Sequence, residues 1–137
     1  MKSSSFAKLY AEPAMPRPIR REICLYTDLA SPGARGFSPP GAHFPDEYFV
    51  VRQDDAVYAY RNVCPHAGNF LNWKADAFLT RDKRLIMCAA HGALFDPASG
   101  VCVAGPCVGR ALQALPVKVE DGMVVAYFDA LPESLDE

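Results

Sequence analysis

Apolar and polar residues alternate most clearly in two stretches of the chain, residues 47–62 and 115–129. Apolar side chains at every second position are typical of strands with one buried face. Each stretch is divided by a short polar turn, at residues 54–55 and 121–122, and turns of this kind join adjacent antiparallel strands. The pattern therefore predicts two β-hairpins.

Shorter runs of apolar residues predict further strands at residues 22–27, 84–88 and 92–100, the last of these ending in a turn. Two other segments, residues 31–45 and 100–113, are rich in Gly and Pro and indicate irregular loops. No stretch of ten residues has the periodicity of an amphipathic helix. We therefore expect a small all-β protein.

The length of 137 residues suits one domain that can bury a core of its own. Residues 1–21 are rich in Ser, Pro and Arg without periodicity, and they predict a flexible N-terminal arm. Residues 129–137 predict an acidic C-terminal tail. The folded domain is then expected over residues 22–128.

Composition and charge exclude several classes of protein. The formal net charge of −2 argues against nucleic acid as the main partner, because binding to a phosphate backbone needs a basic face. No apolar run approaches the roughly 20 residues of a membrane span. The N-terminus lacks the apolar core of a secretory signal, so a cytoplasmic protein is expected. In that compartment five cysteines indicate metal or redox chemistry before structural disulfides.

Two of the three histidines lie beside cysteines in motifs with the same order of residues. Cys64 and His66 are one residue apart, Cys88 and His91 are two apart, and a glycine closely follows each histidine. Thiolate and imidazole together suit zinc or an iron–sulfur centre. Structural zinc sites commonly have like ligands close together, whereas a mixed pair in each loop lets both loops reach both irons of a Rieske cluster. In that arrangement the cysteines hold one iron and the histidines hold the other.

The motifs C-P-H-A-G and C-A-A-H-G-A-L-F-D-P-A-S-G, followed by A-G-P-C, resemble a Rieske-type [2Fe–2S] domain of the ferredoxin-like kind over about residues 45–128. The resemblance implies an antiparallel β-sandwich of three small sheets with two cluster-binding loops at one end. It implies one [2Fe–2S] cluster per chain, bound by Cys64, His66, Cys88 and His91. It also implies a third loop over the cluster, which contains Gly105-Pro106. The 21 residues between His66 and Cys88 exceed the spacing expected for the family, which places an insertion at residues 73–84.

Residues beside the predicted ligands bear on the reduction potential. Gly68 and Gly92 have no Cβ, so we expect that backbone N–H groups can approach the cluster sulfides there; the alternative is that both are simply turn glycines. High-potential Rieske proteins carry a disulfide between the two loops and Ser and Tyr hydroxyls directed at the cluster. At the corresponding positions this chain has Asn69, Ala90, Ala93 and Phe95. Without those donors the potential is expected near the roughly −150 mV end of the Rieske range.

The remaining residues indicate an electron-transfer component without a catalytic site of its own. A Rieske oxygenase also needs a mononuclear iron bound by two His and a carboxylate, and only His43 is left for it. No Gly-rich dinucleotide fingerprint precedes a helix, and no small-molecule substrate is expected. We expect a small ferredoxin-like carrier that supplies single electrons to a partner oxygenase or reductase. That partner is expected to dock near His66 and His91.

Two other interpretations stay open. The chain could be a tightly bound small subunit of a larger reductase, similar to nitrite reductase small subunits, or a zinc-stabilised interaction module. Cys102 and Cys107 could form a disulfide or a redox-sensing pair, although two small apolar fillers are the preferred interpretation. Cys24 and Trp73 are expected to fill the core.

Overall fold

The computed structural model of the protein describes residues 18–66 and 68–128. Ten strands in these residues form three antiparallel sheets, and a single 3-10 turn, Tyr26–Asp28, is the one helical element among them. The predicted all-β fold of three small sheets is therefore confirmed. No helix in the described part of the chain is long and apolar enough to cross a membrane.

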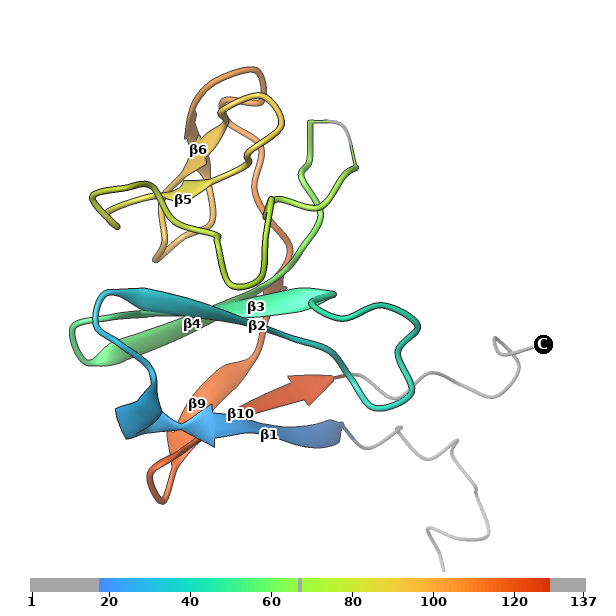
Figure 1. Ribbon diagram of the computed structural model, residues 1–137, viewed down its shortest axis with the longest axis vertical. Helices are drawn as coiled ribbons and strands as arrows, with labels where there is room; N and C mark the ends of the chain where they lie inside the picture. Colours follow the sequence, from blue (N-terminus) through green and yellow to red (C-terminus); the bar gives the residue numbers. More distant parts are fainter. Residues whose placement is uncertain (1–17, 67, 129–137) are drawn as a thin grey trace, which may run out of the picture.

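The three sheets follow one another along the long axis of the molecule (Figure 1). The lowest sheet has the order β1-β10-β9, with strands Ile19–Leu25, Met123–Phe128 and Val117–Glu120. The middle sheet has the order β2-β3-β4-β8, with strands Gly33–Phe37, Tyr48–Gln53, Ala56–Arg61 and Ala114–Leu115. The upper sheet has the order β5-β6-β7, with strands Ile86–Met87, Leu94–Phe95 and Cys102–Ala104.

The middle sheet packs against a core on each face. Successive side chains of a strand point to opposite sides, so one strand can contribute to both cores. Phe49 and Val51 of β3 belong to an upper core shared with the upper sheet, whereas Val50 belongs to a lower core shared with the lowest sheet. All three side chains are fully buried. The upper core also contains the thiols of Cys64, Cys88, Cys102 and Cys107. It therefore joins the middle sheet to the loops that the sequence predicts to bind metal.

Both predicted hairpins are present. Strand β3 pairs with β4, and β9 pairs with β10, across turns at residues 54–55 and 121–122. Asp54, Asp121 and Gly122 have positive φ angles of 56°, 51° and 79°. Tight turns between antiparallel strands require this left-handed conformation, which Gly adopts freely and Asp tolerates better than most residues.

Two strands lie in segments that the Gly and Pro content predicted to be irregular loops. Strand β2 falls within residues 31–45, and β7 falls within residues 100–113. The glycines of β2 permit close packing: a Cβ on Gly36 would lie 2.3 Å from Asp46 Oδ1, and one on Gly33 would lie 2.5 Å from a backbone oxygen. The loop prediction for β2 was wrong because a strand glycine can also mark a close approach of neighbouring atoms.

The first strand begins at Ile19, three residues before the predicted start of the domain. Arg20 of this strand contacts Glu120 of β9 through an ion pair of 3.0 Å, so residues 19–21 belong to the lowest sheet. The remainder of the predicted arm, residues 1–17, and the predicted tail, residues 129–137, lie outside the described residues.

The insertion at residues 73–84 folds against the middle sheet. Asp76 Oδ1 accepts a hydrogen bond of 2.8 Å from a backbone N–H of β2. Phe78 stacks on Phe49 with their ring centroids 4.3 Å apart. The side chain of Trp73, in contrast, is 67% exposed, so the prediction that it fills the core is wrong. Phe78 provides the apolar anchor of this segment instead.

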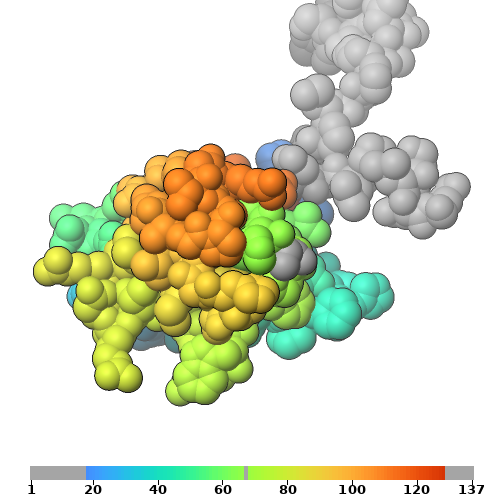
Figure 2. All heavy atoms as spheres, turned by 90° about the horizontal axis from the view of Figure 1, so that it is seen from above, coloured from blue at the N-terminus to red at the C-terminus, as the bar shows by residue number. Residues whose placement is uncertain are grey.

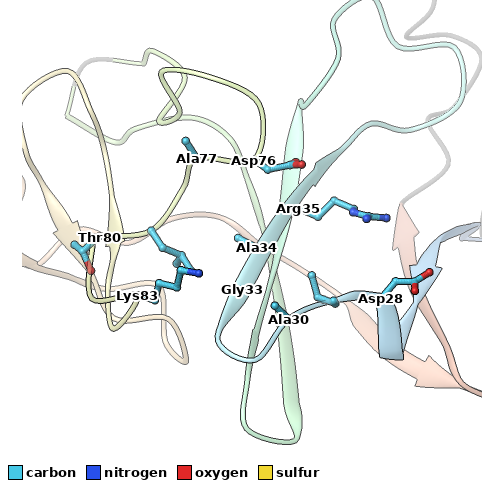
Figure 3. Close-up of a pocket in the computed structure, with 11 residues that line it drawn as sticks. Asp28, Ala30, Gly33, Ala34, Arg35, Asp76, Ala77, Thr80 and Lys83 are labelled. Atoms are coloured by element: carbon cyan, nitrogen blue, oxygen red, sulfur yellow. The ribbon is translucent and has the colours of Figure 1, made fainter.

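A recess of about 340 Å³ lies between this insertion and strand β2 (Figure 3). Its rim carries charged side chains of both signs, which include Asp28, Arg35, Asp76 and Lys83. None of the predicted metal ligands lines it. The recess is therefore separate from the predicted metal centre.

Candidate metal centre

The two Cys/His motifs lie side by side at the upper end of the molecule. The rings of His66 and His91 meet edge to face, with centroids 5.0 Å apart. Both histidines are exposed, whereas Cys64 and Cys88 are each only 1% exposed. The first loop (residues 64–69) follows β4, and the second loop (residues 88–93) follows β5. The fold thus places two exposed imidazoles and two buried thiols at the same end of the molecule. Figure 2 shows this end from above.

Both loops contain the same backbone turn. The N–H of Gly68 donates to the carbonyl of Cys64 at 2.7 Å, and the N–H of Gly92 donates to the carbonyl of Cys88 at 2.9 Å. The two glycines have φ angles of 78° and 73°, and a Cβ on either would meet no atom within 4 Å. Glycine is therefore needed here for its left-handed conformation. Their own N–H groups close these turns, and an approach of backbone N–H groups to cluster sulfide in these loops stays a prediction.

Asn62 anchors the first loop from below. This side chain is fully buried and follows β4 two residues before Cys64. Its amide nitrogen donates to the carbonyl of Asp46 and to Asn72 Oδ1. Its amide oxygen accepts the N–H of Leu71 at 2.7 Å. Asn62 was not among the residues predicted from the sequence; the available signal was an asparagine directly after an alternating strand.

A third loop, residues 105–110, lies against both of the other loops. Gly105 packs so closely on the second loop that a Cβ would lie 2.8 Å from Ala93 Cα. At its other end Arg110 Nη1 donates to the carbonyl of Pro65 in the first loop at 3.0 Å. Pro106 is exposed between these contacts. In Figure 2 this loop is orange and touches the green first loop and the gold second loop.

One side-chain hydrogen-bond donor near the predicted ligands was not predicted from the sequence. Ala93 and Phe95 are both buried and carry no hydroxyl. Asn69 Nδ2, however, lies 3.5 Å from Cys88 Sγ and is a hydrogen-bond donor to it. From the sequence, Asn69 was interpreted only as the residue at the position of a disulfide cysteine in high-potential Rieske proteins. Its contact with the second loop could not be seen in the sequence.

All five cysteines lie in the described part of the chain, where they are buried and form no disulfide. Cys107 Sγ lies 3.3 Å from Cys102 Sγ, and Cys107 also borders Cys64. Burial, reinforced by the neighbouring Cys102, raises the pKa of the Cys107 thiol to about 12. Cys107 therefore stays neutral at physiological pH. Cys24 lies in the lower core, as expected.

The predicted ligands fit a two-iron cluster by their chemistry. In a Rieske cluster one iron takes two thiolates and the other takes two imidazoles. Among the described residues, no three His, Cys, Asp or Glu side chains form a site for a single metal ion. The structure instead offers two buried sulfurs and a pair of adjacent exposed imidazoles. This donor set has the two kinds of ligand that such a cluster requires.

Comparison with known proteins identifies the family. The model of the Rieske [2Fe–2S] domain family matches residues 24–128. The chain is also 32% identical over 114 residues to the ferredoxin component of the alkene monooxygenase system of Xanthobacter autotrophicus, covering 82% of this chain and 84% of that protein. The chain therefore belongs to the Rieske [2Fe–2S] domain family. The predicted [2Fe–2S] cofactor and its function in single-electron transfer are confirmed.

Solved structures of ferredoxins share the fold. The ferredoxin of carbazole 1,9a-dioxygenase from Nocardioides aromaticivorans superposes with a TM-score of 0.61 at 28% identity, covering 80% of this chain and 96% of that chain. A chain from a complex of reduced oxygenase and oxidized ferredoxin in carbazole 1,9a-dioxygenase has a TM-score of 0.64 at 26% identity, covering 83% and 98%. The similarity thus spans nearly the whole length of both solved chains.

Proposed function

We propose that Cys64 and Cys88 bind one iron of the cluster, that His66 and His91 bind the other, and that the chain is a small carrier which supplies electrons to an oxygenase. The observation that carries this proposal is the placement of two buried thiols and two adjacent exposed imidazoles at one end of the fold. When bound, the cluster supplies a centre that accepts and releases one electron at a time.

The two cysteines and the two histidines differ in burial, and this difference suits different roles. The thiols of Cys64 and Cys88 lie in the upper core, which excludes water from that side of the centre. His66 and His91 are exposed, so a partner can approach the imidazole side directly. Neutral imidazoles carry no charge, whereas thiolates do, which makes it easier to add an electron than at an all-thiolate centre.

The surface around the histidines suits a transient protein partner. We name it the tip surface and define it as His66, His91, Pro106, Val108 and Arg110. Val108 is 63% exposed, and Pro106 and Arg110 are exposed beside it. Transient redox complexes have small interfaces, and a charge at the rim of an interface can speed association.

An oxygenase is the preferred partner because proteins similar to this chain belong to oxygenase systems. One belongs to an alkene monooxygenase system, and another was solved in a complex of reduced oxygenase and oxidized ferredoxin. We also propose a cytoplasmic location, which is supported by five cysteines that form no disulfide in the described residues.

A tightly bound subunit of a reductase is the second candidate. Val103 and Val108, which are 51% and 63% exposed, would also suit a permanent interface. Against it, this chain covers 84% of a relative that is itself a ferredoxin component. Purification from the native host separates the two, because a carrier elutes alone in size-exclusion chromatography and a bound subunit elutes with a large partner.

Metal analysis and EPR spectroscopy test the ligand assignment. Freshly purified protein should contain equal iron and acid-labile sulfide. After reduction with dithionite it should give an EPR signal whose average g lies well below that of an all-cysteine cluster. Replacing His66 or His91 with Ala should abolish this signal, whereas His43→Ala, in an exposed loop, should leave it unchanged. Stoichiometric zinc without sulfide after anaerobic, iron-replete preparation would overturn the proposal in favour of a zinc-stabilised module.

A further inference from the structure

Asn69 of the first loop contacts a cysteine of the second loop. Its amide nitrogen Nδ2 lies 3.5 Å from Cys88 Sγ, within hydrogen-bonding range for a sulfur acceptor. The two residues are 19 positions apart in the chain, so this contact exists only because the fold brings the two loops together. Asn69 is half-buried, which limits competition from water for the sulfur.

A second hydrogen bond determines which end of the amide faces the sulfur. Nδ2 also donates to the carbonyl oxygen of Phe70 at 2.8 Å. An asparagine NH₂ group has two N–H donors, so it can make both contacts together. Rotating the amide by half a turn would place Oδ1 against the Phe70 carbonyl oxygen, and two acceptors repel each other. The amide therefore presents an N–H group to Cys88.

The shape of the first loop does not depend on this side chain. The backbone carbonyl of Asn69 accepts the N–H of Cys64 at 2.8 Å, and the N–H of Gly68 closes the turn on the Cys64 carbonyl. Both bonds remain when the side chain of Asn69 is replaced. The position can therefore be varied while the loop keeps its backbone structure.

We propose that Asn69 raises the reduction potential of the centre by donating a hydrogen bond to the sulfur of Cys88. This inference rests on the proposed assignment of Cys88 as an iron ligand. A hydrogen bond to a ligand sulfur stabilises the reduced state more than the oxidised state, because the reduced state carries more negative charge. Asn69 acts through Cys88 and is a positioning residue. It compensates in part for the hydroxyl groups that Ala93 and Phe95 lack.

Redox titration of two variants tests the proposal. Asn69→Leu keeps the approximate size of the side chain and removes the donor, and Asn69→Ala removes the side chain beyond Cβ. Gln113→Leu is the matched control, because it removes an exposed amide outside the three loops. The equilibrium constant for reduction by a fixed redox dye should fall about tenfold in both Asn69 variants, which corresponds to about 59 mV for a one-electron couple. Gln113→Leu should stay at the wild-type value.

Proton spectroscopy gives a readout that does not depend on the potential. Pulsed ENDOR of the reduced protein in H₂O and D₂O should show an exchangeable proton coupled to the centre. That proton signal should be missing in Asn69→Leu and present in Gln113→Leu.

The possible failures can be told apart. An intact EPR signal with potentials in both Asn69 variants equal to that of Gln113→Leu would overturn the role of Asn69 alone. Faster loss of iron from these variants with an unchanged potential would assign Asn69 a purely structural role and would also overturn it. A wild-type protein without the mixed-ligand EPR signal would refute the ligand assignment itself.

Discussion

At the scale of single residues, Asn62 shows how a buried polar group can determine the shape of a metal-binding loop. Its side chain makes three hydrogen bonds to segments before and after the first loop, at Asp46, Leu71 and Asn72. A buried polar side chain is costly unless it is hydrogen-bonded, and here both ends of the amide are. Asn62 therefore ties the strand that leads into Cys64 to the chain that leaves the loop.

Replacing Asn62 should destabilise the protein strongly. Asn62→Ala leaves the buried N–H of Leu71 and the carbonyl of Asp46 without these partners, and each lost partner costs about 1–3 kcal/mol. We expect the free energy of unfolding to fall by more than about 2 kcal/mol in urea denaturation monitored by circular dichroism. Asn62→Asp keeps the acceptor for Leu71 but places a buried carboxylate against the Asp46 carbonyl and Asn72 Oδ1, so it should also be strongly destabilising. A value for Asn62→Ala within about 0.5 kcal/mol of wild type would contradict the anchoring role.

The sequence could reveal the four predicted ligands but not the residues that hold them. The four ligands can be predicted because Cys and His occur in two motifs with the same order of residues and a characteristic spacing. Asn62, Asn69 and Arg110 have their roles only through partners that lie up to 45 positions away in the chain. Such contacts are set by the packing of loops, which the local pattern of residues does not encode.

At the scale of elements, the third loop depends on one close contact. Gly105→Ala would place a Cβ 2.8 Å from Ala93 Cα and would strain a residue with φ of 101°. Backbone strain costs about 1–3 kcal/mol, and overpacking against backbone typically adds about 1–3 kcal/mol. We expect this variant to unfold at a lower temperature and to lose iron faster under challenge with a chelator.

Gly109→Ala is a matched control within the same loop. Gly109 has a similar φ of 90°, but a Cβ there would meet no atom within 4 Å. The control therefore has the backbone strain without the steric conflict. If both variants lost iron at the same rate, contact between the third and second loops would not matter for retention of the cluster.

Tyr60 of β4 connects the middle sheet to the turn after β6. Its hydroxyl donates to the carbonyl of Pro97 at 2.6 Å, and burial raises the pKa of Tyr60 to about 12. Tyr60→Phe should lower the free energy of unfolding by about 1 kcal/mol at pH 7, because it removes this hydrogen bond.

The pH dependence of Tyr60→Phe provides a second test. An unfolded tyrosine ionises near pH 10, whereas folded Tyr60 stays protonated to about pH 12. The unfolded state therefore binds fewer protons, and wild-type stability falls as the pH rises from 10 to 12. Tyr60→Phe should lack this contribution, so the difference between the two proteins should shrink in that range. A difference that stays constant would contradict the raised pKa.

Strands were predicted correctly where apolar and polar residues alternate regularly. A strand was missed where glycines serve close packing and not a loop. The two hairpins follow from alternation across Asp and Gly turns, and both are present. Strand β2 was missed because Gly33 and Gly36 were interpreted as loop residues, although the structure needs them for close packing. The small size of β7, three residues, left too short a pattern to detect.

At the scale of the whole molecule, the part of the chain that contains the tip surface has a net positive charge because it has few acidic residues. Between residues 62 and 111 the chain has five Lys and Arg and three Asp and Glu, although the complete chain has a net charge of −2. Arg110 is held against the first loop by its hydrogen bond to the carbonyl of Pro65. Charges near the point of electron exit steer the approach of a charged reaction partner.

Small redox reagents can measure this steering without a protein partner. In Arg110→Glu, oxidation of the reduced protein by the anion ferricyanide should slow by roughly twofold or more at low salt, and oxidation by a cationic cobalt complex should accelerate. Both effects should vanish near 1 M salt, where the Debye length is about 3 Å. Arg81→Glu makes the same change of net charge on the exposed turn of the insertion. Equal effects from the two variants would show that only the net charge matters, whereas a larger effect from Arg110→Glu would place electron exit at the tip surface.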